Sequence, residues 1–380
     1  MISKIKYFFT ERLTRRTRLF LKSSSISFAS AVLLMLVVVI AWNWLTSPPD
    51  QREVIAAPPV DQNNPIVDDE GFLIVDNTEP SDDDEYDEPS LPTYNAPSWA
   101  VDRREYFWTF LIIGLNEGTN ANTVMAASYC GITRESSLIS IPRDIPVHPT
   151  RNGRKLSSSY MIGAGGGRGI AGGVAQMQRD VQTVIGFIPD FYVVIDYDAF
   201  FSIIDAVGGI SVYVPVRMRY DDPLQNLRID IQPGYQHMDS ATALDFARFR
   251  QGNPGFPDLP GGDIGRVANQ QAVINAVISR LLRPENIFRI NEFVSIFNES
   301  VYTNISLLDM LFFANELNRI RRTDSETDAL TTYTFAAHAA TSNNISYMFL
   351  TPSNVVELVN STINPFDRPI SAADLRIIRP

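Results

Sequence analysis

The chain has 380 residues, 45% of them hydrophobic, which is enough for one large domain with appendages or for two modest domains. Its formal net charge of −11 hides a strong sorting of charge along the sequence. Residues 101–380 carry 24 basic and 28 acidic side chains and are nearly neutral, and we expect no nucleic-acid partner. The single cysteine, Cys130, excludes an intramolecular disulfide, so the folded part must be held by its core.

The first 45 residues have the pattern of a membrane anchor. Residues 1–24 contain seven Lys or Arg and one acidic residue, whereas residues 25–45 contain no charge at all. At about 1.5 Å per residue, the uncharged segment would span a hydrocarbon core about 30 Å thick as a transmembrane helix. The positive-inside rule then places residues 1–24 in the cytoplasm and the C-terminal body outside the cytoplasmic (inner) membrane. A cleaved signal peptide, the competing interpretation, would have a shorter apolar stretch.

Residues 46–104 are rich in Pro, Asp, Glu and Asn, and the stretch 50–100 alone holds 14 acidic residues against one arginine. Such a composition cannot bury enough apolar surface to offset the entropy of ordering. We therefore expect a disordered acidic linker, followed by a folded body over residues 105–380.

Strand-like and helix-like segments alternate in the body. Short apolar runs at 107–118, 123–130 and 136–142 predict strands. The segment 190–210 predicts a strand that runs into a helix ending at Gly208 and Gly209. A further strand is predicted at 211–216, and helices at 172–187, 240–247, 264–282, 286–297, 306–321 and 353–362. The alternation favours a layered α/β domain.

Two arginines one residue apart, Arg248 and Arg250, follow the predicted helix 240–247 in a segment with β character. On a strand, positions i and i+2 share a face, so both guanidinium groups would project into one space. Two planar forks of donors suit a diphosphate better than a single carboxylate. An exposed pair that forms surface salt bridges is the alternative interpretation of an isolated Arg-x-Arg motif.

Other segments add polar groups to such a site. Arg143 and Asp144 follow a predicted strand, at the position where α/β sheets commonly gather ligand-binding groups. Asp263 begins the helix 264–282, on which Arg266 and Gln270 lie four residues apart and therefore on one face.

The segment 152–173 places Arg154 and Lys155 before a glycine-rich loop. This loop lacks the spacing of a phosphate-binding P-loop, so a mobile connection is the favoured interpretation. The three histidines are scattered without metal-ligand spacing, and Cys130 has the character of a small core residue. The residues alone thus predict an extracytoplasmic α/β domain whose arginines converge on a polyanion, for which a lipid-linked phosphate is a natural candidate.

Several ordered motifs over residues 107–284 resemble those of the LytR-CpsA-Psr family of bacterial cell-envelope proteins: LIIGLNEG, LISIPRD, DFYVVIDYDAFFSIIDAVGGI, LDFARFR and GGDIGRVANQQ. Residues 285–380 are less recognisable. The resemblance implies a three-layer α/β/α fold with a central mixed β-sheet and a hydrophobic channel for a polyprenyl chain. It also implies transfer of a glycopolymer from a polyprenyl-pyrophosphate carrier to peptidoglycan or another envelope acceptor, with Mg²⁺ as the usual cofactor. A transferase of this kind could also hydrolyse the pyrophosphate.

The resemblance also implies roles for individual residues. Pyrophosphate-binding positions are, by their place in the motifs, Arg143, Lys155, Arg248, Arg250, Arg266 and Gln270. Asp144 and Asp263 would join the arginines in catalysis, by orienting them or by assisting proton transfer.

Departures from the family pattern concern the metal. Members usually carry Asp where this chain has Asn116 and Asn122, so the implied magnesium site has lost two negative charges. Glu117 is a possible substitute, although neighbours on an extended segment face opposite ways. Asn269 stands where an arginine is common. Three hypotheses follow: a glycopolymer transferase, a non-catalytic polyprenyl-phosphate-binding protein, or an envelope scaffold or regulator.

Overall fold

The computed structural model describes residues 48–49, 103–116, 120–150, 153–223, 227–281, 283, 301–317, 330–342 and 344–378, together with residues 295, 297 and 299. The predicted basic segment and transmembrane helix lie outside the described residues, as do almost all of the predicted linker and most of the helix predicted at 286–297. In the described part of the chain, no helix is both long enough and apolar enough to cross a membrane.

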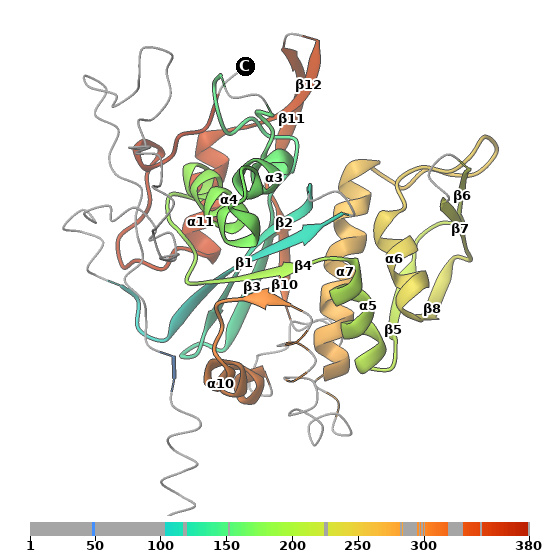
Figure 1. Ribbon diagram of the computed structural model, residues 1–380, viewed down its shortest axis with the longest axis horizontal. Coiled ribbons are helices and arrows are strands. Elements are labelled where there is room, and N and C mark those ends of the chain that lie inside the picture. Colours follow the sequence, from blue (N-terminus) through green and yellow to red (C-terminus); the bar gives the residue numbers. More distant parts are fainter. Residues whose placement is uncertain are drawn as a thin grey trace, which may run out of the picture. The chain divides into compact units, whose positions relative to one another are not determined.

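A six-stranded mixed sheet, in the order β10-β3-β2-β1-β4-β9, forms the centre of the body (Figure 1). The strands β1 (Phe107–Leu115), β2 (Ala121–Cys130) and β3 (Glu135–Ser140) pair antiparallel, which confirms the three strands predicted from their apolar runs. The strands β4 (Phe191–Ile195) and β10 (Thr331–Thr334) lie parallel to β1 and β3. The short strand β9 (Tyr302–Thr303) closes the order antiparallel to β4.

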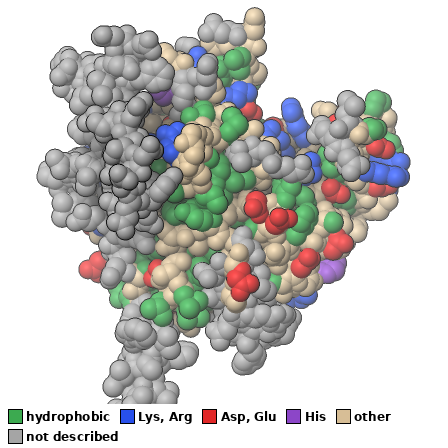
Figure 2. Space-filling model, in the orientation of Figure 1, with side chains coloured by type: hydrophobic (Ala, Val, Ile, Leu, Met, Phe, Trp, Pro, Cys, Tyr) green, Lys and Arg blue, Asp and Glu red, His purple; other side chains and the backbone are tan. Residues whose placement is uncertain are grey.

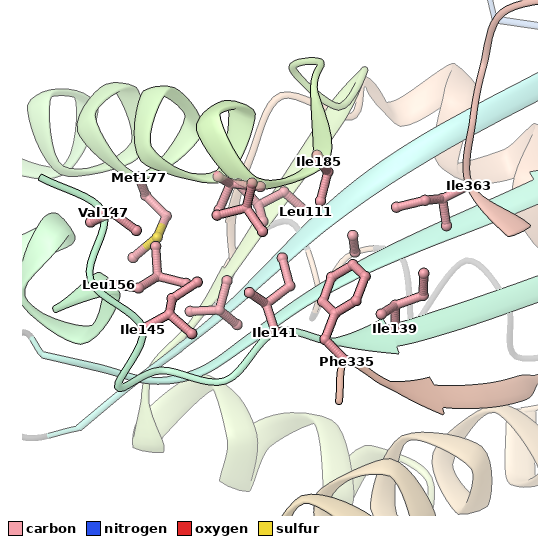
Figure 3. Close-up of a cluster of buried hydrophobic side chains, with 14 of the residues drawn as sticks. Leu111, Ile139, Ile141, Ile145, Val147, Leu156, Met177, Ile185, Phe335 and Ile363 are labelled. Atoms are coloured by element: carbon pink, nitrogen blue, oxygen red, sulfur yellow. The ribbon is translucent and has the colours of Figure 1, made fainter. Parts of the chain in front are cut away.

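The sheet is buried on both faces, because alternate residues of β1 enter different cores. Leu111 and Ile113 pack with helices α4 (Gly169–Ile185) and α11 (Pro352–Thr362). Figure 3 shows this core, with Leu111, Ile139 and Ile141 facing Met177 and Ile185. The alternation follows from the period of two in a strand.

Phe110 and Ile112, on the opposite face of β1, pack against other helices. Their partners include Ile274 of α7 (Asp263–Leu281) and Phe313 of α10 (Leu307–Leu317). Helices therefore cover both faces, and the three-layer α/β/α arrangement with a central mixed sheet agrees with the expectation from the sequence.

A second core lies beside the sheet (Figure 1). The helix α5 (Tyr197–Ala206) follows β4 directly and ends before Gly208 and Gly209, as predicted. Two small antiparallel pairs come next in the chain: β5 (Ile210–Val214) with β8 (Gly234–Met238), and β6 (Met218–Asp222) with β7 (Leu227–Ile231). Together with α6 (Ser240–Arg248) and α7, they bury residues such as Ile229, Met238 and Phe246. The sequence did not predict β6, β7 or β8.

The glycine-rich segment forms a close helix contact and does not line the cavity described below. It contains α3 (Ser159–Ala164) and the start of α4. A Cβ added to Gly163 would lie 2.2 Å from the carbonyl oxygen of Gly172, so only glycine allows these two helices to approach. A hairpin of β11 (Ala337–Ser342) and β12 (Ile345–Leu350) precedes α11.

Candidate functional site

A cavity of about 620 Å³ opens at the carboxyl ends of β1 and β4. Helices α5, α6 and α7 and the hairpin β6–β7 form its other walls. Ligand sites in α/β sheets commonly lie at such strand ends. The apolar part of the wall includes Leu115, Phe200, Leu227, Ile229, Leu244 and Ile274.

Four arginines from three segments line this one cavity: Arg143, Arg248, Arg250 and Arg266. Arg143 follows β3, the next two lie at and just beyond the end of α6, and Arg266 is in the first turn of α7. In Figure 2, several Lys and Arg side chains are visible in the upper part of the face shown, and others lie at its right-hand edge. The structure therefore brings together all four arginines that the sequence predicted for the site.

The predicted strand that was to hold Arg248 and Arg250 is wrong. Asp239 caps α6 by accepting a hydrogen bond from the Thr242 amide at 2.8 Å, and the helix continues through Arg248. Phe249 is then extended and buried, with 1% of its surface exposed. The two arginines share the cavity because the chain leaves the helix at Phe249, whose ring enters the second core. Arg248 also lies 5.5 Å from the ring centre of Tyr197.

Arg266 lies in a partly buried space close to other guanidinium groups. Burial lowers the pKa of Arg266, and the charges of Arg143 and Arg250 lower it further, while Asp263 and Asp144 act in the opposite direction. Its side chain pairs with Asp263 at 2.6 Å, but its buried Nε has no hydrogen-bond partner among the described residues. Guanidinium groups that repel one another in a partly buried space are stabilised by a bound anion.

Three other predicted residues lie beside the cavity and do not line it: Asp144, Lys155 and Asp263. The ammonium group of Lys155 donates to Asp144 at 2.8 Å, and Asp144 also lies 3.8 Å from Nε of Arg143. Each of the two carboxylates is thus paired with a cation and can orient it. Gln270, the remaining predicted residue, does line the cavity one helical turn after Arg266.

Asp196 is the one carboxylate among the described residues that line the cavity, and the sequence did not single it out. It caps α5 by accepting a hydrogen bond from the Ala199 amide at 2.8 Å through Oδ1. Burial, followed by the charges of Tyr302 and Asp196, raises the pKa of Tyr160 to about 12. An aspartate between a strand and a helix is an ordinary capping residue. Asp196 was therefore not predicted from the sequence as a site residue. Its position directly after the strand β4 was the one feature of the sequence that could have indicated a place in the site.

Asn269 does not take the position of a cavity arginine. It is buried, with 4% of its surface exposed, and its Nδ2 donates to the carbonyl oxygen of Phe246 at 3.0 Å. Phe246 lies in the last turn of α6, where helix carbonyls lack intrahelical partners. Asn269 therefore connects α7 to the end of α6 from which Arg248 and Arg250 extend.

The donor groups near Asn116 and Asn122 do not fit a magnesium ion. Both residues line the cavity, but Oδ1 of Asn122 accepts a hydrogen bond from Arg143 at 2.6 Å. Oδ1 of Asn116 accepts one from the Asn120 amide at 3.0 Å. Within the described ranges, no group of three His, Cys, Asp or Glu residues could hold a metal ion. Mg²⁺ prefers carboxylate oxygens, and Glu117 lies outside the described residues.

The sequence pattern of the LytR_cpsA_psr family matches residues 99–364. A teichoic acid transferase of Bacillus subtilis, named polyisoprenyl-teichoic acid--peptidoglycan teichoic acid transferase TagV, is 28% identical over 57% of this chain and 54% of its own length. Biofilm regulatory protein A of Streptococcus mutans is 24% identical over 67% of this chain and 62% of its own length. The chain thus spans little more than half the length of these relatives.

Solved structures share the fold. The crystal structure of B. subtilis TagV has a TM-score of 0.54 at 22% identity, and the match covers 68% of this chain and 96% of the crystallised chain. The protein gbs0355 from Streptococcus agalactiae has a TM-score of 0.57 at 21% identity, covering 72% and 92%. TagT bound to LI-WTA has a TM-score of 0.52 at 15% identity, covering 70% and 92%.

Proposed function

Because this chain belongs to the LytR_cpsA_psr family, we propose that it transfers a glycopolymer from a polyprenyl-pyrophosphate carrier to peptidoglycan or another envelope acceptor. One observation carries this proposal: four arginines and a long apolar wall share a single cavity. A diphosphate needs several cationic donors, and a polyprenyl chain needs a continuous apolar surface. The relative whose name specifies teichoic acid transfer to peptidoglycan supports the same class of substrate.

In this proposal the cavity holds the two parts of the carrier lipid separately. Arg143, Arg248, Arg250 and Arg266 bind the diphosphate, and Gln270 donates a further hydrogen bond. Asp144 and Asp263 keep Arg143 and Arg266 oriented through their ion pairs. The polyprenyl chain lies along the apolar wall that includes Phe200, Ile229 and Leu244.

The transfer step is an attack by an acceptor hydroxyl on the phosphorus that carries the glycopolymer. A new bond forms between the acceptor oxygen and phosphorus, and the bridging bond of the diphosphate breaks, so that polyprenyl phosphate leaves with the electron pair. Arginines aimed at the diphosphate stabilise the charge that develops on the leaving phosphate. Asp196 would take the proton of the acceptor hydroxyl, because it is the carboxylate on the described cavity wall. Water in place of the acceptor would hydrolyse the diphosphate.

The proposal includes the cellular location expected from the sequence. Residues 25–45 would anchor the protein in the cytoplasmic membrane, with residues 1–24 in the cytoplasm. The acidic linker would let the body reach lipid carriers in the outer leaflet and acceptors beyond it. This single-pass arrangement is consistent with a cavity suited to a lipid-linked anion.

The test is a transfer assay with the full chain in proteoliposomes. The donor is a polyprenyl-pyrophosphate-linked oligosaccharide with a radiolabelled sugar, and the acceptor is purified peptidoglycan. We expect label to enter peptidoglycan and to be lost in the double variant Arg248→Ala/Arg250→Ala. Tight binding of the donor without transfer would favour a lipid-phosphate receptor, the hypothesis motivated by Asn116 and Asn122. Absence of donor binding would contradict both functions.

A further inference from the structure

We propose that the side-chain oxygen of Asn122 orients Arg143 and does not bind a metal ion, so that diphosphate binding by this chain is independent of magnesium. The inference rests on the proposed function, because it concerns how the same cavity binds the diphosphate. In this inference the side-chain oxygens of Asn116 and Asn122 accept hydrogen bonds from the chain itself, whereas the carboxylates of a metal site would bind the ion.

The contact between Arg143 and Asn122 carries the inference. Nη1 of Arg143 donates to Oδ1 of Asn122 at 2.6 Å, and both side chains line the cavity. A metal ion bound to the same oxygen would lie only a few ångströms from the guanidinium group and would be repelled by it. Asn122 therefore serves as the acceptor that orients Arg143 without adding a negative charge beside the diphosphate.

The side chain of Asn116 also forms a hydrogen bond within the chain. Asn116 and Asn120 close the loop after β1 through two hydrogen bonds. The backbone N–H of Asn116 donates to the backbone carbonyl oxygen of Asn120 at 3.0 Å. The backbone N–H of Asn120 donates to the side-chain Oδ1 of Asn116, also at 3.0 Å. The ends of this loop are thus joined by two hydrogen bonds.

The charge balance of the cavity agrees with these contacts. A divalent cation held by two carboxylates adds no net charge to a site, and two amides without a cation add none either. The four cavity arginines therefore present the same positive field to a diphosphate in both arrangements. Burial, followed by the charges of Arg143 and Arg250, lowers the pKa of Arg266, so this guanidinium group lies near other cations of the same cavity.

Two measurements on the full chain in detergent micelles test the inference. The first is electron paramagnetic resonance of Mn²⁺, a stand-in for Mg²⁺, with protein in excess and no phosphate present. The second is the dissociation constant of polyprenyl pyrophosphate in EDTA and in excess Mg²⁺. We expect the Mn²⁺ signal to remain that of the free ion. We expect the dissociation constant to change less than about threefold between the two conditions, because no charge-assisted contact depends on the metal.

Three variants sharpen the comparison. Arg143→Met should weaken binding of the lipid in EDTA about tenfold or more, through loss of charge-assisted contacts, and added Mg²⁺ should not restore it. The double variant Asn116→Asp/Asn122→Asp should bind Mn²⁺ and should need a metal for lipid binding, because two carboxylates then oppose the diphosphate. Arg228→Met, at an exposed position of β7 that does not line the cavity, is the matched control and should bind like the unmodified chain.

The outcomes separate the inference from the proposed function. Lipid binding that is unchanged by EDTA, together with a free Mn²⁺ signal, supports both. Binding of Mn²⁺ by the unmodified chain, or lipid binding that requires Mg²⁺, overturns the inference of magnesium-independent binding and leaves the proposed function standing. Failure to bind the lipid under either condition overturns the proposed function and the inference with it. The tests on the unmodified chain are decisive even where a variant does not fold.

Discussion

Asn269 of α7 donates a hydrogen bond from Nδ2 to the carbonyl oxygen of Phe246 at 3.0 Å and thereby fixes the end of α6. Replacement by the similarly sized leucine leaves that buried carbonyl without its partner. We expect Asn269→Leu to reduce the free energy of unfolding by about 1–3 kcal/mol and to weaken diphosphate binding, since Arg248 and Arg250 leave α6 just beyond this bond. Thermal unfolding and lipid-binding measurements would check both effects.

The exposed Asn354 of α11 provides the control for this variant. Asn354→Leu also exchanges a side-chain amide for a similarly sized apolar group, but away from the cavity, and should leave lipid binding unchanged. If Asn269→Leu bound the lipid as tightly as the unmodified chain, the proposed positioning of the arginine pair by α7 would be incorrect.

The arginine pair after α6 should dominate diphosphate binding. Removing both guanidinium groups by Arg248→Ala/Arg250→Ala deletes two charge-assisted contacts and should weaken binding at least about a hundredfold, without unfolding the domain. Isothermal titration with polyprenyl pyrophosphate measures the change, and circular dichroism checks the fold.

The chain contains a second Arg-x-Arg motif that serves as a matched control. Arg217, just before β6, and Arg219 of β6 both pair with Asp230 of β7, and neither arginine lines the cavity. Arg217→Ala/Arg219→Ala removes the same charge from the molecule. Equal losses of affinity in the two double variants would mean that overall charge, and not the cavity, binds the lipid.

Asp196 combines a helix cap with a cavity carboxylate, and two substitutions separate these functions. Asn is as good an N-cap as Asp, so Asp196→Asn should keep the stability while removing the proton acceptor. We expect its transfer rate to fall about 10²-fold to 10⁴-fold with little change in donor affinity. Asp196→Ala should lose the same activity and about 1 kcal/mol of stability in addition. A transfer rate near that of the unmodified chain in Asp196→Asn would exclude a role as the base.

The apolar wall should be needed for the polyprenyl chain and not for the phosphates. Leu244 of α6 lines the cavity, and Leu244→Trp should fill part of the space. We expect weaker binding of polyprenyl pyrophosphate and unchanged binding of inorganic pyrophosphate, as measured by competition titration. Ile132→Trp, at a side chain that is 67% exposed and outside the cavity wall, is the control. Parallel losses for both ligands would indicate a displaced arginine cluster and would contradict the assigned lipid path.

The sequence predicted those parts of the site that depend on local periodicity. Arg266 and Gln270 share a helix face because four residues make about one turn, and both line the cavity. Arg143 was placed correctly because it follows a buried strand. The predicted basic segment, transmembrane helix and linker stay predictions, because the described residues do not test them.

The errors arose where contacts distant in the sequence decide the outcome. Arg248 is helical because α6, which is capped at Asp239 and buries Phe246, continues through it. The burial of Phe249 in the second core could not be predicted from the local sequence pattern. Lys155 lies beside the cavity because it pairs with Asp144. The hairpin β6–β7, which supplies Ile229 to the wall, was missed because its short strands are recognisable only by their pairing.

The most direct test of the account is a crystal structure of the protein with polyprenyl pyrophosphate bound. The account predicts both phosphates among Arg143, Arg248, Arg250 and Arg266, with the polyprenyl chain along Phe200 and Leu244. It further predicts that Arg143 still contacts Asn122 and that crystals grown with Mg²⁺ show no ion between Asn116 and Asn122. Phosphates bound elsewhere, or a lipid chain outside this cavity, would contradict the central claim.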